Sequence, residues 1–121
     1  MNDSSLIDPK HLMQAECQPC EGLSSLSPEE YAAYLDSVAQ WQVESLSGVP
    51  TLVREFVAEN FVDAVRMVQE ISEIAEFDNH HPDLHLTRYK HLRVELTTHV
   101  LDGLSVNDFI VAAKINTHFD Q

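Results

Sequence analysis

The sequence has 121 residues, of which 44% are hydrophobic and 22% are charged, and its formal net charge is −13 at pH 7. That length predicts a single domain with one hydrophobic core. The acidic balance argues against a nucleic-acid-binding face and against docking on an anionic membrane. No apolar stretch approaches the roughly 20 residues that span a bilayer, and the N-terminus lacks the features of a secretory signal. We therefore expect a cytoplasmic protein that binds neither nucleic acid nor membrane.

Residues 1–22 differ from the rest of the chain because they lack sustained periodicity. We interpret them as a flexible N-terminal tail, followed by one domain over residues 23–121. Cys17 and Cys20 form a Cys-x-x-Cys pair of the kind found in redox and zinc sites. No second pair accompanies them and no βαβ pattern follows, which favours a structural or incidental role.

The first predicted helix begins after Ser27. Ser27 is suited to the N-cap, Pro28 to the first helical position, and Glu30 completes a capping box. Apolar residues then follow at helical spacing from Tyr31 and extend the predicted helix to about Gln40.

Two short strands are predicted next. Residues 41–44 alternate between apolar and polar, and residues 51–57 are rich in β-branched and aromatic side chains. Residues 47–50, with the sequence Ser-Gly-Val-Pro, predict a hairpin-like turn between them.

A second helix is predicted to begin at Asn60 as N-cap, with Asp63 three residues later. Its apolar stripe continues for about four turns. The pattern breaks at Phe77, and Pro82 disfavours a helical conformation at His81, so the helix must end before this point.

The pattern changes to period two over residues 89–100, which predicts a long strand with one buried face and one polar face. His99 falls on the predicted polar face. Ser105 and Asp108 then predict the start of a third helix, whose apolar residues cover so much of its circumference that it should pack against more than one surface. The order of elements predicts an α+β fold with helices on one face of an antiparallel sheet.

Histidines between positions 80 and 99 form the main candidate for a functional site. Imidazoles have an ordinary pKa of about 6.5, so one can donate a proton while another accepts one near neutral pH. Nearby carboxylates would raise the pKa of such imidazoles. The histidines are His80, His81, His85, His91 and His99, and the carboxylates are Glu76, Asp78 and Asp83.

Two alternatives to a catalytic histidine cluster remain open. Histidines beside a proline in a loop are common without any catalytic role. A zinc site is the other alternative, but His80 and His81 are adjacent and point in different directions, and no His-x-x-x-His pair on a helix accompanies them.

The spacing of these residues resembles the signature of the pterin-4a-carbinolamine dehydratases. The matching positions are Glu76, His80-His81-Pro82, Tyr89, His99 and Asp108, supported by the opening around Cys17 and Cys20, by Trp41, and by Gly103-Leu104-Ser105. The resemblance implies an α+β fold with a four-stranded antiparallel sheet, three helices on one face, and assembly into homodimers or homotetramers. The wide apolar coverage of the third helix is a second reason to expect an oligomer, with contacts between subunits at the outer face of this helix and at an exposed sheet edge.

The resemblance also implies an activity: the metal-free dehydration of 4a-hydroxytetrahydropterin to quinonoid dihydropterin, a lyase reaction of tetrahydrobiopterin recycling. The pterin is then the substrate, and no cofactor is needed. In this interpretation the acid–base residues are His80, His81 and His99, and the supporting residues are Glu76, Pro82, Tyr89 and Asp108.

A finer resemblance points to another function. Residues 81–89 and 107–115 resemble the dehydratase-like branch implicated in Rubisco assembly in plastids and α-carboxysomes. Leu84 and His85 stand where many dehydratases have an aromatic pair, and the stretch from His81 to His99 is one residue longer than in those enzymes. The resemblance implies an assembly chaperone for the Rubisco large subunit, associated with the carboxysome and with weak or absent dehydratase activity. The alternative is an active dehydratase in pterin recycling.

Overall fold

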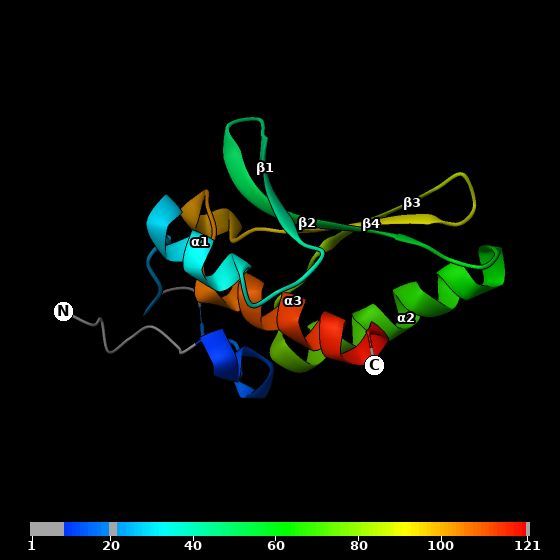
Figure 1. Ribbon diagram of the computed structural model, residues 1–121, viewed down its shortest axis with the longest axis horizontal. Coiled ribbons are helices and arrows are strands. Elements are labelled where there is room, and N and C mark those ends of the chain that lie inside the picture. Colours follow the sequence, from blue (N-terminus) through cyan, green and yellow to red (C-terminus); the bar gives the residue numbers. More distant parts are fainter. Residues whose placement is uncertain (1–8, 20–21, 121) are drawn as a thin grey trace.

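The computed structural model describes residues 9–19 and 22–120, and it contains one sheet with helices on one of its faces (Figure 1). The four strands are antiparallel in the order β1-β2-β4-β3. The predicted α+β class, with four strands and three helices on one face, is confirmed. The elements are η1 (Pro9–Gln14), α1 (Pro28–Leu35), β1 (Gln42–Leu46), β2 (Val49–Val57), α2 (Phe61–Asp78), β3 (Asp83–Thr87), β4 (His91–Leu96), η3 (His99–Leu101) and α3 (Val106–Phe119).

The first helix begins as predicted but ends early. The Ser27 hydroxyl accepts a hydrogen bond from the Glu30 N–H at 3.2 Å, and the Glu30 carboxylate accepts one from the Ser27 N–H at 2.9 Å. The extension to about Gln40 is wrong, because α1 ends at Leu35. The N–H groups of Ser37 and Val38 bond to carbonyls three residues earlier, so the chain tightens into turns there.

The hairpin of β1 and β2 turns at Ser47 and Gly48. Both residues have positive φ, 52° and 82°, which is the backbone of a two-residue hairpin turn and explains the glycine. The strands extend closer to this turn than predicted, since β1 continues to Leu46 and β2 begins at Val49.

Helix α2 has the predicted start. The Asn60 side chain accepts a hydrogen bond from the Asp63 N–H at 2.8 Å. The helix ends at Asp78 because Asn79 adopts the left-handed conformation, with φ of 51°, and donates its N–H to the Ala75 and Glu76 carbonyls.

Strand β4 is shorter than predicted. The period-two pattern continues to residue 100, but the strand ends at Leu96 and His99 begins the 3-10 turn η3. The placement of His99 on the polar face of a strand is therefore wrong. The physical reason is tertiary, because the buried Thr98 hydroxyl bonds to Ser105 and Asp108 and draws the chain toward α3. The residue pattern did not indicate the short edge strand β3, which only the family resemblance implied.

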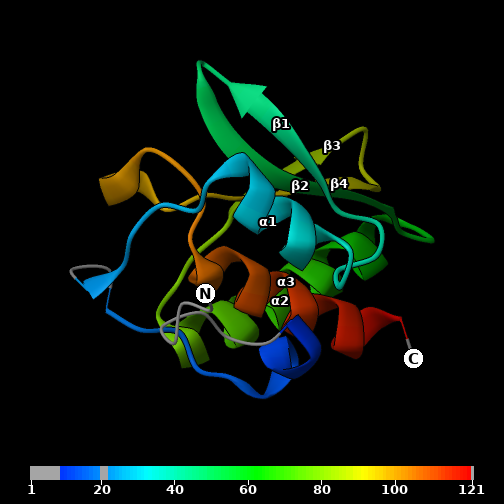
Figure 2. The same ribbon diagram turned by 60° about the vertical axis from the view of Figure 1, so that its left-hand side comes forward.

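Helix α3 lies at the centre of the fold, between α2, η1 and the sheet (Figure 2). Its residues from Val106 to Ala113 are all buried. The prediction that α3 packs against more than one surface is confirmed, but those surfaces belong to the same chain. Its apolar circumference therefore gives no reason to expect a subunit contact there, and the oligomeric state stays a prediction.

The described part of the N-terminal segment packs on this core. Leu12 of η1 is 1% exposed and belongs to the hydrophobic cluster. The Gln18 N–H donates to Asn107 Oδ1 at 3.0 Å, and Asn107 Nδ2 donates to the Gln18 carbonyl at 2.7 Å. These contacts differ from the expectation of a loose tail over 1–22. Residues 1–8 and Cys20 lie outside the described residues, so flexibility there stays a prediction.

None of the helices formed by residues 9–19 and 22–120 is both long and apolar enough to cross a membrane. On the face of the sheet opposite the helices, an ionic network lies on the same side as Val53 and Val57. Arg93 of β4 bonds there to Glu44, Glu55 and Glu95.

Candidate functional site

His80 is the buried member of the histidine cluster. It follows the left-handed cap of α2, and its N–H bonds to the Ala75 carbonyl at 3.1 Å, so the end of the helix fixes its backbone. The side chain is 8% exposed, and its Nε2 lies 2.7 Å from Oδ1 of Asp108. Helices α2 and α3, which are separated in sequence, thus place this pair together.

Asp108 is fully buried, and its two carboxylate oxygens bond to different partners. Oδ1 faces His80, while Oδ2 accepts hydrogen bonds from the Thr98 hydroxyl at 2.8 Å and from the Ser105 N–H at 2.9 Å. An ionised carboxylate can only accept, so Nε2 of His80 carries the proton in this pair. The carboxylate therefore orients the imidazole and selects its tautomer.

His81 makes a similar pair at the surface. Its Nε2 lies 2.5 Å from Oε2 of Glu76 in the last turn of α2, and both side chains are exposed. In both pairs the carboxylate contacts Nε2. Among the described residues, Nδ1 of His80 and of His81 has no hydrogen bond, and it is the ring nitrogen left for a ligand.

His99 lines the same hollow as His80 and His81. A hollow of about 230 Å³ is lined by His80, His81 and His99 together with Asn79, Thr97, Thr98 and Val100. The three predicted acid–base residues are thus brought together, although His99 arrives on η3 and not on a strand. Their roles in a reaction stay predictions.

A second hollow of about 220 Å³ adjoins the first through His99 and Thr97. Its other walls carry the carboxylates of Asp83, Glu95 and Asp102. Burial raises the pKa of Glu95, but hydrogen bonds from Arg93 and His85 outweigh it and hold this pKa below its ordinary value. His99 therefore stands between an imidazole-lined hollow and an acidic one.

The arrangement of these histidines suits acid–base chemistry. Nowhere in the described ranges 9–19 and 22–120 do three histidine, cysteine, aspartate or glutamate side chains gather in a way that could hold a metal ion. With one ring nitrogen held by a carboxylate, an imidazole is oriented to give or take a proton at the other. The expectation of a metal-free site stays a prediction.

The sequence matches a family model described as Pterin 4 alpha carbinolamine dehydratase over residues 24–118. The chain belongs to this dehydratase family. It is 38% identical to a Chlorobium luteolum protein named "Putative pterin-4-alpha-carbinolamine dehydratase", over 91% of this chain and 96% of that protein. It is also 35% identical to the mitochondrial pterin-4-alpha-carbinolamine dehydratase 2 of Arabidopsis thaliana, covering 87% of this chain and 57% of that longer protein.

A solved structure shares the dehydratase fold. The crystal structure of a transcriptional coactivator/pterin dehydratase from Brucella melitensis superimposes with a TM-score of 0.69 at 26% identity, over 78% of this chain and 97% of that one. The family is thus supported by both sequence and fold.

The remaining positions of the dehydratase signature have different surroundings. Pro82 follows His81 directly and begins the connection to β3, while Asp108 and Glu76 hold imidazoles as described. Tyr89 is exposed in the turn between β3 and β4, with φ of 55°. It precedes β4 whereas His99 follows β4, so the two lie at opposite ends of that strand. The structure therefore does not bring Tyr89 to the hollow that His80, His81 and His99 line.

Thr98 and Ser105 hold the carboxylate of Asp108 in place, but the sequence pattern does not assign either residue to the site. Thr98 and Ser105 bond to each other at 2.7 Å and both donate to Asp108. A usable signal was present for Thr98, a polar residue at an inward position of the period-two pattern beside His99. Ser105 was recognised only as a helix cap, because sequence spacing does not reveal that its partner Asp108 also meets His80.

Proposed function

We propose that this chain is a Rubisco assembly factor that keeps the pterin dehydratase fold and has weak or absent dehydratase activity. Its partner is the Rubisco large subunit, and its place is the cytoplasm, in association with the α-carboxysome. Two segments resemble the Rubisco assembly branch: residues 81–89 contain β3 and contribute His81 to the histidine hollow, and residues 107–115 lie in the core helix α3.

The observation that carries the proposal of weak dehydratase activity is the small volume of the histidine hollow together with its lining. At about 230 Å³ it is smaller than the roughly 300–1,000 Å³ of ordinary small-molecule sites. Among the described residues that line it, the only rings are imidazoles, so no phenyl, phenol or indole side chain offers a flat face to a bicyclic pterin. This supports weak pterin binding.

The position that differs from many dehydratases lies outside the histidine hollow, so it adds no argument about pterin binding there. His85 projects from β3 on the face of the sheet opposite the helices, and its Nε2 lies 3.2 Å from Oε1 of Glu95. Its neighbour Leu84 is half-buried against the core on the other face. Neither side chain lines the histidine hollow.

An active dehydratase is the second candidate, and the histidine pairs favour it. Loss of water from the 4a carbon needs a proton delivered to the leaving hydroxyl and another removed from a ring nitrogen. His80 and His81 each have one nitrogen fixed by a carboxylate, and His99 lines the same hollow. Imidazoles in opposite protonation states could carry out both transfers.

The test is to co-express Rubisco subunits with and without this chain and to measure assembled Rubisco on native gels, beside a dehydratase assay on the purified protein. We expect more assembled Rubisco with the chain present. We expect turnover at least about 10²-fold below an authentic dehydratase, since a loop shift of ~1 Å can cost that much. Turnover within a few-fold of an authentic dehydratase, with unchanged Rubisco yield, would favour the second candidate.

A further inference from the structure

Residues 15–19, which follow η1 and which we call the strap, bond to both helices that carry the buried histidine pair. The strap precedes the part of the chain that matches the dehydratase family model. It bonds to Asp78 at the end of α2 and to Asn107 at the start of α3. Asp78 stands two residues before His80, and Asn107 stands directly before Asp108. The strap therefore holds the two segments whose approach forms this pair.

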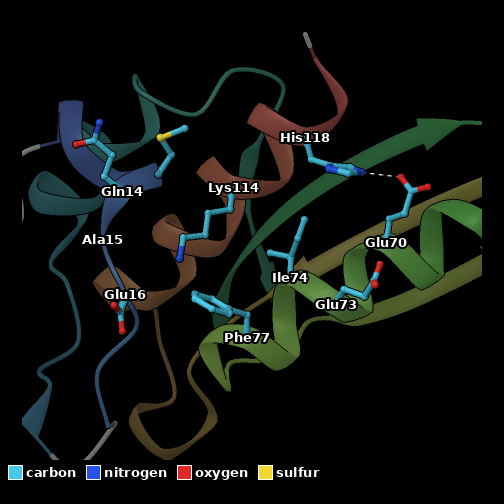
Figure 3. Close-up of a pocket in the computed structure, with 10 residues that line it drawn as sticks. Gln14, Ala15, Glu16, Glu70, Glu73, Ile74, Phe77, Lys114 and His118 are labelled. Atoms are coloured by element: carbon cyan, nitrogen blue, oxygen red, sulfur yellow. Dashed lines mark hydrogen bonds and ion pairs between the residues drawn. The ribbon is translucent and has the colours of Figure 1, made fainter.

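Asp78 is the last residue of α2, and its side chain is only 1% exposed. Its Oδ1 accepts a hydrogen bond from the Cys17 N–H at 3.2 Å, and its Oδ2 lies 2.6 Å from Nζ of Lys114 on α3. Figure 3 shows Lys114 extending from α3 toward the segment that follows η1, near Phe77 of α2. Helix ends fray when nothing holds their last residues. Because Asp78 is tied to the strap and to α3, the end of α2 is fixed two residues before His80.

Asn107 is the second residue of α3 and is 1% exposed. Its amide bonds twice to the backbone of Gln18, because Oδ1 accepts from the N–H at 3.0 Å and Nδ2 donates to the carbonyl at 2.7 Å. The Cys17 thiol also donates to the backbone carbonyl of Asn107 at 3.6 Å. Successive side chains of a helix point about 100° apart. Asn107 therefore faces the strap while Asp108, in the same turn, faces His80.

The orientation of the His80 imidazole depends on both of these anchored helix ends. Its Nε2 lies 2.7 Å from Oδ1 of Asp108, and a hydrogen bond weakens steeply when its distance or angle departs from the ideal. His80 itself lies beyond the end of α2, after the left-handed Asn79. A small movement of the end of α2 relative to the start of α3 would therefore break this bond and release the tautomer that it selects.

We propose that the strap keeps the His80 imidazole oriented on Asp108, with Asp78 and Asn107 as positioning residues that act through the ends of α2 and α3. None of the strap residues lines the histidine hollow, and neither positioning residue does. The strap thus extends the site to a segment outside the region of the family match. This inference concerns the geometry of the histidine pair and does not depend on the proposed role in Rubisco assembly.

The test measures, by NMR on the full chain, how fast the Nε2 proton of His80 exchanges with water. This proton exchanges when the histidine pair opens locally, so its rate reports the pair and not the whole fold. Gln18→Pro deletes the N–H that donates to Asn107, and Asn107→Ala removes both bonds to the strap. We expect about threefold to tenfold faster exchange in each variant, as for the loss of one or two hydrogen bonds. Gln18→Pro added to Asn107→Ala should give no further acceleration, because its partner is already absent.

Two controls separate positioning from general stability. Gln18→Ala changes the same exposed side chain but keeps the N–H, so it should leave the exchange unchanged. Asn116→Ala removes the other asparagine that ties α3 to a distant segment, since Asn116 bonds to Trp41 and Ala39. It should lower stability in urea and leave the exchange of the His80 proton as in wild type.

Three results would overturn the proposal. The first is unchanged exchange of the His80 proton in Gln18→Pro and Asn107→Ala. The second is equal acceleration in Asn116→Ala, because the proton would then report only the stability of the whole fold. The third is an additive effect in the double variant, because the proline would then act at a place other than Asn107.

Discussion

Replacing Asp108 with asparagine is the sharpest perturbation of the histidine site. The change keeps the size of the side chain but replaces one carboxylate oxygen with an NH₂ donor. Thr98 and Ser105 both donate to Oδ2, so the amide oxygen must stay on their side and the NH₂ group must face Nε2 of His80. His80 then has to accept at Nε2, which moves its proton to Nδ1.

The expected loss of stability in Asp108→Asn follows from the burial of the Asp108–His80 pair. The side chains of Asp108 and His80 are 0% and 8% exposed, so a charge-assisted hydrogen bond is exchanged for a neutral one away from water. A charge-assisted bond contributes about 1.5–3 kcal/mol and a neutral one about 0.5–1.5 kcal/mol, so we expect the free energy of unfolding, measured in urea, to fall by the difference, about 1–1.5 kcal/mol. In the wild type, nitrogen-15 NMR of the imidazole should show the proton of His80 on Nε2, and in Asp108→Asn on Nδ1.

Glu76→Gln is the matched control, because it makes the same chemical change in the exposed pair with His81. Exposed pairs contribute about 0–1 kcal/mol, so this variant should barely change the free energy of unfolding. If Asp108→Asn cost no more than Glu76→Gln and left the tautomer of His80 unchanged, the assignment of Asp108 as the residue that orients His80 would be refuted.

Three further results are expected. Leu12→Ala should lower the free energy of unfolding by about 2–5 kcal/mol, as for a core leucine, whereas a loose tail would give no change in urea unfolding. Glu95→Gln should destabilise the fold by about 1 kcal/mol at neutral pH, because the pKa of Glu95 is lowered in the folded state. The difference from wild type should shrink as pH falls below the ordinary value of 4.5 and through the lowered pKa, and a pH-independent difference would contradict this. Any dehydratase turnover should fall by about 10²–10⁴ on His81→Ala or His99→Ala and should survive a chelator, and turnover unchanged by both substitutions would count against their acid–base role.

Local sequence signals predicted the helix starts well. Ser27, Asn60 and Ser105 are the N-caps of α1, α2 and α3, because a cap depends on side chains within three residues of it. The end of β4 could not be predicted in this way. Its alternating pattern continues past Leu96, and what stops the strand is the bonding of Thr98 to residues of the next helix.

The candidate site also depends on tertiary contacts that the sequence pattern does not show. The histidines were predicted as a cluster, but the burial of His80 and the exposure of His81 follow from how α2 meets α3, and adjacent positions in sequence do not reveal it. Tyr89 has the signature spacing and still lies at the far end of β4, since spacing along the chain does not measure distance across a sheet. The apolar circumference of α3 was interpreted as a subunit contact because the packing of Leu12 against the core was not visible in the sequence.

The most direct test of the proposed function is the amount of assembled Rubisco formed when its subunits are co-expressed with this chain. The account predicts an increase over expression without the chain. It also predicts that His81→Ala leaves this increase intact, because the assembly role does not require acid–base chemistry at the exposed imidazole. Two results together would contradict the account: the amount of assembled Rubisco is unchanged by the chain, and the purified chain dehydrates 4a-hydroxytetrahydropterin at the rate of an authentic dehydratase.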